Sequence, residues 1–416
     1  MIERVRARVG WLLSWLRVGV ALASLSACAA EPVGLDRDDE TDRILVMLPL
    51  PAPHFRADSG YASSYDDALG RSARRRAVLR LARSYRLELL FDWPMPLLNV
   101  HCYELRLPSG VIAAPVLRSL GNEPAVAWAQ PMNLYRAQGE PAAAPGLMQS
   151  WRLADLHQLA TGRGASVAVI DSSVDASHPA LAAQVSAREN FVRGRPDMAE
   201  RHGTAVAGLI AARADQASAI VGVAPQARIM ALRACWQVIS GATLCNSLSL
   251  ALALQFAVVH QAQVINMSLS GPRDPLLERL LDAALAHGSA VVAAIDRSAG
   301  DGGFPASHPG VVAVADDGPG NSLPPHTLQA PGRDLPTTAP GAGWSLVSGS
   351  SFAAAQVSGL MALLSELRGG QPPLGEGKAL VQSLAGGVDA CATLMRISGS
   401  CVCSCTTSSA ASPGLR

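Results

Sequence analysis

The chain has 416 residues, which is more than one small domain needs and allows a catalytic unit with an accessory unit. Apolar residues make up 49% of it, charged residues 16%, and the formal net charge is +1. These values indicate an ordinary globular interior and exclude a protein that binds nucleic acid mainly through its charge, so no nucleic-acid partner is expected.

The first 28 residues have the pattern of an export signal. Arg4, Arg6 and Arg8 precede an apolar stretch that ends in Leu25-Ser26-Ala27-Cys28. This ending resembles the lipobox of bacterial lipoproteins, which makes Cys28 the predicted lipidation site, with an ordinary cleaved signal or an uncleaved anchor as the alternatives. We expect an exported protein of the bacterial cell envelope, lipid-anchored as a precursor or secreted after processing. Membrane contact is expected only through this segment, because no other stretch reaches the ~18 apolar residues of a spanning helix.

An accessory unit is predicted at residues 44–137, after a polar, acidic tether at 29–43. Its apolar patterns predict four strands and two helices in the order βαββαβ, which is that of a ferredoxin-like α+β domain. The strands are expected at 44–50, 87–91, 100–107 and 125–128, and the helices at 65–85 and 114–120. Residues 138–150 are rich in small residues and proline, and this linker is expected to be exposed.

Residues 151–368 alternate short apolar runs with helical stretches. The runs at 167–170, 228–232, 264–267, 290–294 and 311–315 are typical of buried strands, and helices are expected at 204–213, 248–260, 275–287 and 352–367. Such alternation predicts an α/β fold with a doubly wound, mostly parallel sheet and helices on both faces. Residues 369–416 form a Cys-containing tail.

Export permits disulfides. Cys235 and Cys245 flank a short loop and form a candidate pair, whereas Cys391 and the three cysteines at 401–405 allow several pairings. A metal site at 401–405 is the alternative, although spacing by single residues fits the common zinc patterns poorly.

Three residues have the chemistry of a nucleophilic site. Asp171 follows the apolar run at 167–170, and functional groups of parallel sheets gather at the carboxyl ends of strands. His202 offers a base that is neutral near pH 7, and the following Gly203 allows another segment to approach closely. Ser351 opens a helix of small residues, whose first N–H groups can stabilise an oxyanion. Taken singly, they also fit a strand terminator, a packing histidine and a helix N-cap.

In the order Asp, His, Ser, these elements resemble the subtilisin superfamily, the subtilases. The similar segments are Val169-Ile170-Asp171, His202-Gly203-Thr204, Gly222-Val223-Ala224-Pro225, Phe304-Pro305-Ala306-Ser307 and Gly349-Ser350-Ser351-Phe352-Ala353. The resemblance covers about residues 151–367 and implies a subtilisin-like serine endopeptidase. In it, Ser351 attacks the carbonyl carbon, His202 moves the proton and Asp171 orients the imidazole.

The same resemblance implies a place for the substrate and exposes one departure. Ser268, Leu269, Ser270 and Gly271 correspond to the strand that binds the substrate backbone. The family places an oxyanion asparagine after a run like 291–294, where this chain has Ile295-Asp296-Arg297. Loss of such a donor costs about 10²- to 10³-fold in turnover.

The remaining oxyanion candidates are the Ser351 N–H, a protonated Asp296 and an inward-turned Arg297. The departure keeps a second hypothesis open, a pseudo-peptidase that binds peptides or proteins without cleaving them.

Residues 44–137 resemble the inhibitor-type propeptides of the same superfamily, which implies self-cleavage between about Tyr135 and Gly146. The expected partners are a protein or peptide substrate and the chain's own propeptide. No cofactor is expected and no metal ligand is assigned. Calcium is admitted as a structural ion on the resemblance, without a recognisable ligand spacing. If Cys28 carries the lipid, cleavage would release the catalytic unit from the membrane.

Overall fold

The computed structural model describes residues 40–50, 66–141, 151–214, 220–318, 322–370, 379–383 and 386–400. The predicted signal with Cys28, most of the tether and the cysteines at 401–405 lie outside the described residues. Within these ranges, none of the helices combines the length and the apolar character needed to cross a membrane.

A seven-stranded parallel sheet forms the centre of the second half of the chain, in the order β16-β15-β14-β12-β7-β9-β8. Its strands are β7 (Ser166–Asp171), β8 (Val185–Asn190), β9 (Arg228–Arg233), β12 (Val264–Met267), β14 (Ala290–Ala294), β15 (Val312–Asp316) and β16 (Leu328–Ala330). The central strands are buried on both faces, which explains why they are apolar runs, broken in β12 by the buried Asn266. The order reverses between β7 and β12, and ligands of open α/β sheets bind at such a point.

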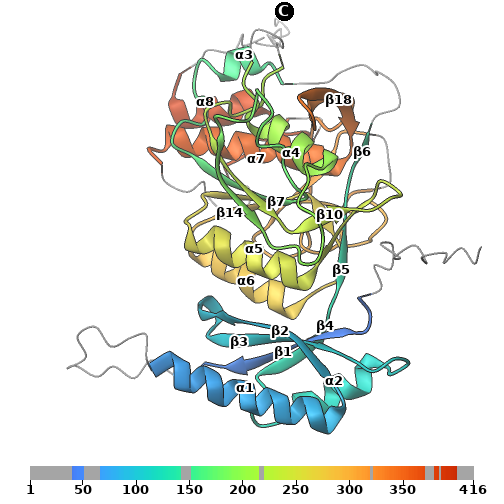
Figure 1. The fold of residues 1–416 in the computed structure, drawn as a ribbon. Coiled ribbons are helices and arrows are strands. Elements are labelled where there is room, and N and C mark those ends of the chain that lie inside the picture. The colour runs from blue at the N-terminus through green and yellow to red at the C-terminus, as the bar shows by residue number, and fades with distance from the viewer. Residues whose placement is uncertain are drawn as a thin grey trace, which may run out of the picture. The chain divides into compact units, whose positions relative to one another are not determined.

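Helices cover both faces of this sheet (Figure 1). One face carries α4 (Arg201–Ala211) and α7 (Ser350–Leu367), with α3 (Leu153–Leu156) and α8 (Ala390–Ser398) beyond them. The other carries α5 (Ser247–Val259) and α6 (Pro275–Ala286). The predicted doubly wound arrangement is therefore present, and the four long helices begin within three residues of their predicted starts.

The accessory unit has a four-stranded sheet in the order β2-β3-β1-β4 with two helices on one face. Its elements are β1 (Arg43–Pro49), α1 (Asp66–Tyr85), β2 (Glu88–Met95), the 3-10 helix η1 (Pro96–Leu98), β3 (Val100–Arg106), α2 (Ala113–Gly121) and β4 (Trp128–Pro131). This is the predicted ferredoxin-like order, with the last strand shifted toward the C-terminus.

Both faces of the accessory sheet are apolar, because every residue of the run 44–48 is buried. Ile44 and Val46 pack with residues of α1 and α2. Leu45 and Met47, which point to the opposite face, share a core with residues of α5 and α6. This sheet therefore buries its second face against the peptidase unit.

Two smaller sheets contain the segment that joins the two units. One has the order β10-β11-β5-β13 and the other β17-β18-β6. Their strands are β5 (Leu134–Ala137), β6 (Glu140–Pro141), β10 (Cys235–Gln237), β11 (Thr243–Asn246), β13 (Leu269–Ser270), β17 (Leu335–Ala339) and β18 (Gly343–Ser348).

Candidate active site

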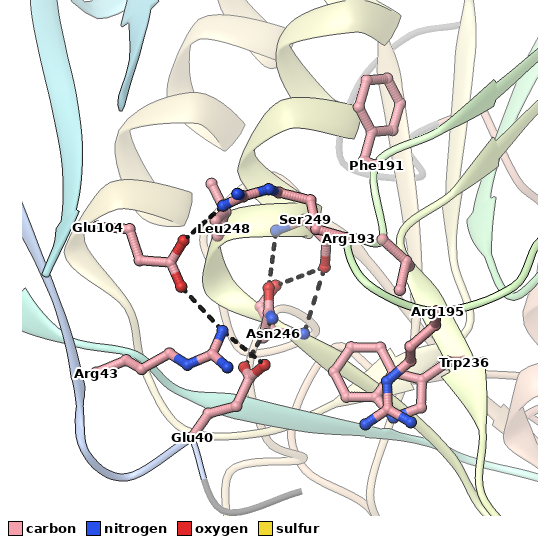
Figure 2. Close-up of a pocket in the computed structure, with 11 residues that line it drawn as sticks. Glu40, Arg43, Glu104, Phe191, Arg193, Arg195, Trp236, Asn246, Leu248 and Ser249 are labelled. Atoms are coloured by element: carbon pink, nitrogen blue, oxygen red, sulfur yellow. Dashed lines mark hydrogen bonds and ion pairs between the residues drawn. The ribbon is translucent and has the colours of Figure 1, made fainter. Parts of the chain in front are cut away.

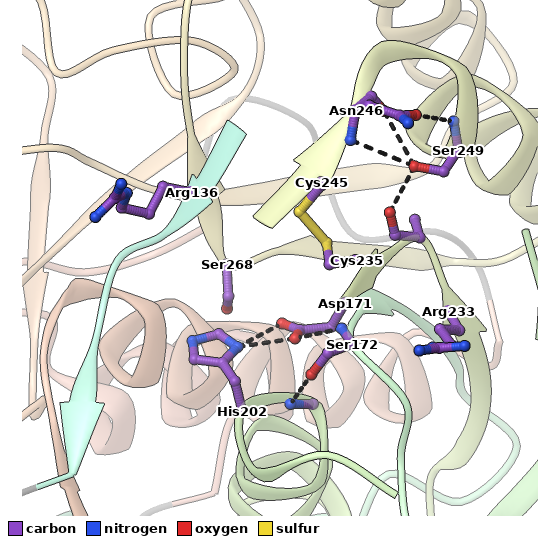
Figure 3. Close-up of a disulfide and its surroundings, with 12 residues drawn as sticks. Arg136, Asp171, Ser172, His202, Arg233, Cys235, Cys245, Asn246, Ser249 and Ser268 are labelled. Atoms are coloured by element: carbon purple, nitrogen blue, oxygen red, sulfur yellow. Dashed lines mark hydrogen bonds and ion pairs between the residues drawn. A yellow bond between two sulfur atoms is a disulfide. The ribbon is translucent and has the colours of Figure 1, made fainter. Parts of the chain in front are cut away.

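Asp171 ends strand β7 beside the reversal point of the sheet and is 2% exposed. Its carboxylate oxygen Oδ1 lies 2.8 Å from Nδ1 of His202, and Oδ2 lies 3.0 Å from the same nitrogen (Figure 3). Oδ1 also accepts a hydrogen bond of 2.6 Å from the Ser172 N–H. A carboxylate in this position holds Nδ1 as the protonated nitrogen and leaves Nε2 free to accept a proton.

His202 is held by the start of helix α4. A Cβ atom on Gly203 would lie 2.1 Å from the Ser172 carbonyl oxygen, so glycine is required for the helix to begin this close to the end of β7. The Gly203 N–H donates to Ser172 Oγ at 3.0 Å, which ties the helix to the residue after Asp171. Nε2 of His202 is buried and makes no hydrogen bond in the described part of the chain.

Ser351 lies in the first turn of α7 and is fully buried. Its hydroxyl donates to the Ser268 carbonyl oxygen at 2.8 Å and accepts from the Gln138 N–H at 2.8 Å. The expected hydrogen bond from this hydroxyl to His202 Nε2 is thus not formed in this conformation. The rings of His202 and Phe352 are nevertheless in contact, with centroids 5.4 Å apart, so the histidine lies beside the start of α7.

The chain's own residues 134–137 lie on the strand where a substrate backbone was expected. Strand β5 pairs antiparallel with β13, with Leu269 opposite Ala137 and Ser270 opposite Arg136. The Gln138 N–H continues this pairing and reaches the Ser268 carbonyl oxygen at 3.4 Å. The other edge of β5 pairs with β11, so the segment is enclosed on both sides.

The end of this strand is further fixed by Tyr135, which is 1% exposed. A Cβ atom on Gly271 would lie 2.4 Å from the Tyr135 ring, and the Tyr135 hydroxyl donates to the Pro272 carbonyl oxygen at 3.1 Å. Gly271, the fourth predicted substrate-binding residue, therefore makes room for a side chain of the bound segment.

The sequence did not predict that β11 pairs with residues 134–137, although the candidate pair Cys235 and Cys245 lies at this place. The predicted disulfide between Cys235 and Cys245 is formed and joins β10 to β11 (Figure 3). It therefore supports one of the two strands that enclose residues 134–137. Cys391 is also disulfide-bonded.

The segment continues past Gln138 on the far side of Ser351. Strand β6 pairs antiparallel with β18, with Glu140 opposite Ser348 and Pro141 opposite Val347. The linker was expected to be exposed, but Gln138 and Gly139 are half-buried, because backbone pairing on both sides draws them into the cleft. Beside the segment the cleft has a volume of about 950 Å³, and His202, Phe352 and Trp344 are among its lining residues.

The Gln138 carbonyl group lies at the N-terminus of α7. The Ser351 N–H donates to its oxygen at 2.8 Å. A Cβ atom on Gly349 would lie 2.7 Å from the same oxygen, and Gly349 has φ 136°, so the close approach and the backbone conformation both require glycine. This is the geometry in which a helix N-terminus stabilises negative charge on a carbonyl oxygen.

The other two oxyanion candidates are directed elsewhere. Asp296 Oδ1 accepts from the N–H and the hydroxyl of Ser298 at 2.8 and 2.6 Å. Arg297 Nε donates to Asp316 Oδ1 at 3.0 Å, and its guanidinium also bonds the Asp316 carbonyl oxygen. The inward turn suggested for Arg297 is therefore wrong, because Asp316 holds that side chain, and of the three candidates Ser351 contacts the Gln138 oxygen.

The accessory unit contacts the peptidase unit through charged groups as well. Figure 2 shows the buried Glu104 between the guanidinium groups of Arg43 and Arg193, at 2.9 and 3.0 Å. Glu40 accepts from Asn246 Nδ2 at 2.7 Å, and its burial raises the pKa of that carboxyl group despite the opposing effect of Arg43. These bonds bring the first strand of the accessory unit against the start of α5.

A second polar contact involves the start of α6. Asp274 is fully buried and caps this helix by accepting from the Leu276 and Leu277 N–H groups. It also accepts from Gln130 Nε2 at 2.7 Å and from Asn133 Nδ2 at 3.0 Å. The accessory unit therefore bonds the carboxylate that caps a peptidase helix.

In the described ranges, no group of three or more His, Cys, Asp or Glu side chains is arranged to hold a metal ion. The structural calcium suggested by resemblance stays untested.

The chain is similar to known serine proteases. The family model described as "Subtilase family" matches residues 162–388. The thermophilic serine proteinase of Bacillus sp. strain AK1 is 33% identical over 267 residues, which cover 60% of this chain and 66% of that protein. The intracellular serine protease of Paenibacillus polymyxa is 33% identical over 227 residues, which cover 50% and 68%.

Among solved structures, fervidolysin from Fervidobacterium pennivorans, described as a keratinolytic enzyme related to subtilisin, has a similar fold. Its TM-score is 0.60 at 22% identity, with 80% of this chain and 55% of that chain covered. The chain thus spans about two thirds of the length of these two relatives and about half of fervidolysin. Because the family model covers more than half of the chain, and a relative 33% identical to it is covered over 68% of its own length, the chain belongs to the subtilase family of serine-type endopeptidases.

Proposed function

We propose that this chain is a peptidase precursor that hydrolyses protein substrates with Asp171, His202 and Ser351, and that its first substrate is its own Gln138–Gly139 bond. The observation that carries the proposal is the position of the Gln138 carbonyl oxygen, 2.8 Å from the Ser351 N–H. Backbone pairing on both sides of this bond supports it. A cut here separates the accessory unit from the peptidase unit.

The reaction begins when the Ser351 hydroxyl turns from the Ser268 carbonyl oxygen, to which it donates in this conformation, toward His202 Nε2. Ser351 Oγ bonds to the Gln138 carbonyl carbon while its proton passes to His202 Nε2, and the Ser351 N–H binds the developing oxyanion. His202 then gives the proton to the Gly139 nitrogen, the C–N bond breaks, and Gln138 remains as an ester of Ser351. Water then gives a proton to His202 and its oxygen bonds to the ester carbon. The bond from this carbon to Ser351 Oγ breaks, His202 returns the proton to Oγ, and the segment leaves with its new C-terminus at Gln138. Asp171 keeps Nδ1 protonated throughout.

The accessory unit acts in this proposal as a propeptide that occupies the cleft until it is removed. Two observations support this role: the accessory sheet shares a core with α5 and α6, and Glu104 of the accessory unit bonds Arg193 of the peptidase unit. Family membership favours this enzyme over a binding module without turnover.

The experiment compares the full-length wild type with Ser351→Ala. The wild type should process itself and react with a fluorophosphonate probe, whereas Ser351→Ala should lose both, since removal of such a nucleophile lowers turnover by about 10⁶-fold. Ser350→Ala is the matched control, because the neighbouring hydroxyl bonds Asp316 and not the Gln138 segment, and it should still be labelled. A wild type that is neither processed nor labelled would favour the pseudo-peptidase.

We also propose that the precursor is exported and lipid-anchored at Cys28, so that processing releases the peptidase unit. In cell fractions, the wild-type fragment should leave the membrane while Ser351→Ala stays there. A processed fragment found only in membranes after its propeptide is degraded would contradict this release.

A further inference from the structure

Gly139, the residue after the proposed cleavage bond, is confined by an aromatic ring. A Cβ atom built on it would lie 2.5 Å from Phe352 Cε2, 3.0 Å from Cδ2 and 3.2 Å from Cζ. Favourable contacts between carbon atoms require about 3.5–4.0 Å. Even alanine is therefore too large for this position while the ring keeps its place.

The backbone conformation of Gly139 does not itself require glycine. Gly139 is absent from the residues with positive φ, whereas Gly349, which faces it, has φ 136°. Its backbone therefore lies outside the left-handed region, in which glycine is favoured. The restriction at this position thus comes from the Phe352 ring.

The ring lines the cleft, but most of its surface is held by the core. Phe352 is 2% exposed, belongs to the core cluster and lies in the first turn of α7, where helix geometry limits its rotamers. Its ring contacts the His202 imidazole, with centroids 5.4 Å apart and planes at 42°. A side chain at residue 139 would push the ring toward His202 or lift the carbonyl of Gln138 from the Ser351 N–H.

We propose that Phe352 is a specificity-determining residue that restricts this peptidase to peptide bonds followed by glycine. The inference rests on the proposed function, since it assumes that Gln138–Gly139 lies in the productive position. The substrate class is therefore defined on the downstream side of the bond, where the first residue has no side chain. Because the clash involves a ring beside the base, a larger residue lowers the rate of bond cleavage and not only binding.

The test is a cycle of four full-length precursors: wild type, Gly139→Ala, Phe352→Ala and the double variant, each followed by its rate of self-processing. Overpacking a buried position by one methyl group corresponds to a loss of about 10- to 100-fold for Gly139→Ala. In the Phe352→Ala background the same change should cost less than about 3-fold. A merely structural role for Phe352 would give no such rescue.

A second measurement avoids any folding defect of Phe352→Ala. The processed wild-type enzyme is given the peptide Leu-Tyr-Arg-Ala-Gln-Gly-Glu-Pro and its analogue with alanine in place of glycine, and kcat/KM is compared. In Phe352→Met, whose flexible side chain has a similar volume, the kcat/KM of the glycine peptide should exceed that of the alanine peptide by a smaller factor than in the wild type. We expect the glycine peptide to be favoured by about 10- to 100-fold with the wild type.

The outcomes separate the two proposals. Equal processing of Gly139→Ala and wild type, or an equal penalty in both backgrounds, overturns the specificity inference and leaves the proposed function intact. A wild-type precursor that processes neither itself nor the glycine peptide overturns the proposed function, and the inference with it.

Discussion

The candidate site has a base side, Asp171 with His202, and an oxyanion side at the Gln138 carbonyl oxygen. On the base side, the buried Asp171 carboxylate holds His202 through two short contacts, whereas on the oxyanion side the Ser351 N–H is the one of the three candidate donors that reaches the oxygen. The first side is built by main-chain elements: the end of β7, the start of α4 and the glycine that lets them meet. The second has this backbone donor, and at the position where the resemblance implies an asparagine donor the chain has Asp296, whose carboxylate bonds Ser298. In the proposed mechanism, this difference means that the base is fully held while the oxyanion has fewer donors than the resemblance implies.

The largest expected effect in this comparison is on the base side. Asp171→Asn keeps the volume but presents a neutral amide to Nδ1 and favours the wrong tautomer of His202, so self-processing should slow by about 10⁴-fold. The measurement is the rate of precursor conversion on gels over days. Asp175→Asn is the matched control, a buried aspartate of the same loop that bonds Ser177 and the Gly341 N–H, and it should still be processed within hours. Equal rates for the two variants would remove Asp171 from the mechanism.

A smaller effect, of opposite sign, is expected on the oxyanion side. Asp296→Asn removes a negative charge and supplies an amide donor, so processing should become faster by about 10-fold or more, within the 10²- to 10³-fold attributed to such a donor. Asp301→Asn makes the same charge change in the same loop, where its carboxylate accepts from the Gly303 N–H, and should not accelerate the reaction. If Asp296→Asn is no faster than this control, the departure at residue 296 does not limit the rate.

Much of the fold could be predicted because the central strands are buried on both faces. The runs at 167–170 and 290–294 are apolar throughout, the run at 264–267 is apolar except for Asn266, and each became a strand within one residue at either end. Strand β8 was not predicted, since its sequence Val-Ser-Ala-Arg-Glu-Asn lies at the sheet edge, is mostly exposed and has no apolar run. An edge strand is stabilised mainly by backbone pairing with its neighbour, and such pairing requires no particular side-chain pattern.

Site residues could be predicted where a short stretch of sequence contains both the functional residue and the residue that allows its packing. His202 is followed directly by Gly203, and this glycine is needed for the close contact with Ser172. The pair His202-Gly203 therefore indicates a tightly packed helix start from the sequence alone. Strands β5 and β6 could not be predicted, because their partners lie more than 100 residues away and the segment between them has the composition of a loop. The close approach of Phe352 to Gly139 is equally long-range, because the two residues are more than 200 positions apart.

The central claim is that Ser351 cleaves the bond between Gln138 and Gly139, and the termini created by the first cut test it most directly. Mass spectrometry at early times of precursor processing should find a new C-terminus at Gln138 and a new N-terminus at Gly139, both absent from Ser351→Ala. A first cut at any other bond, or the same cut in purified Ser351→Ala, would contradict the account.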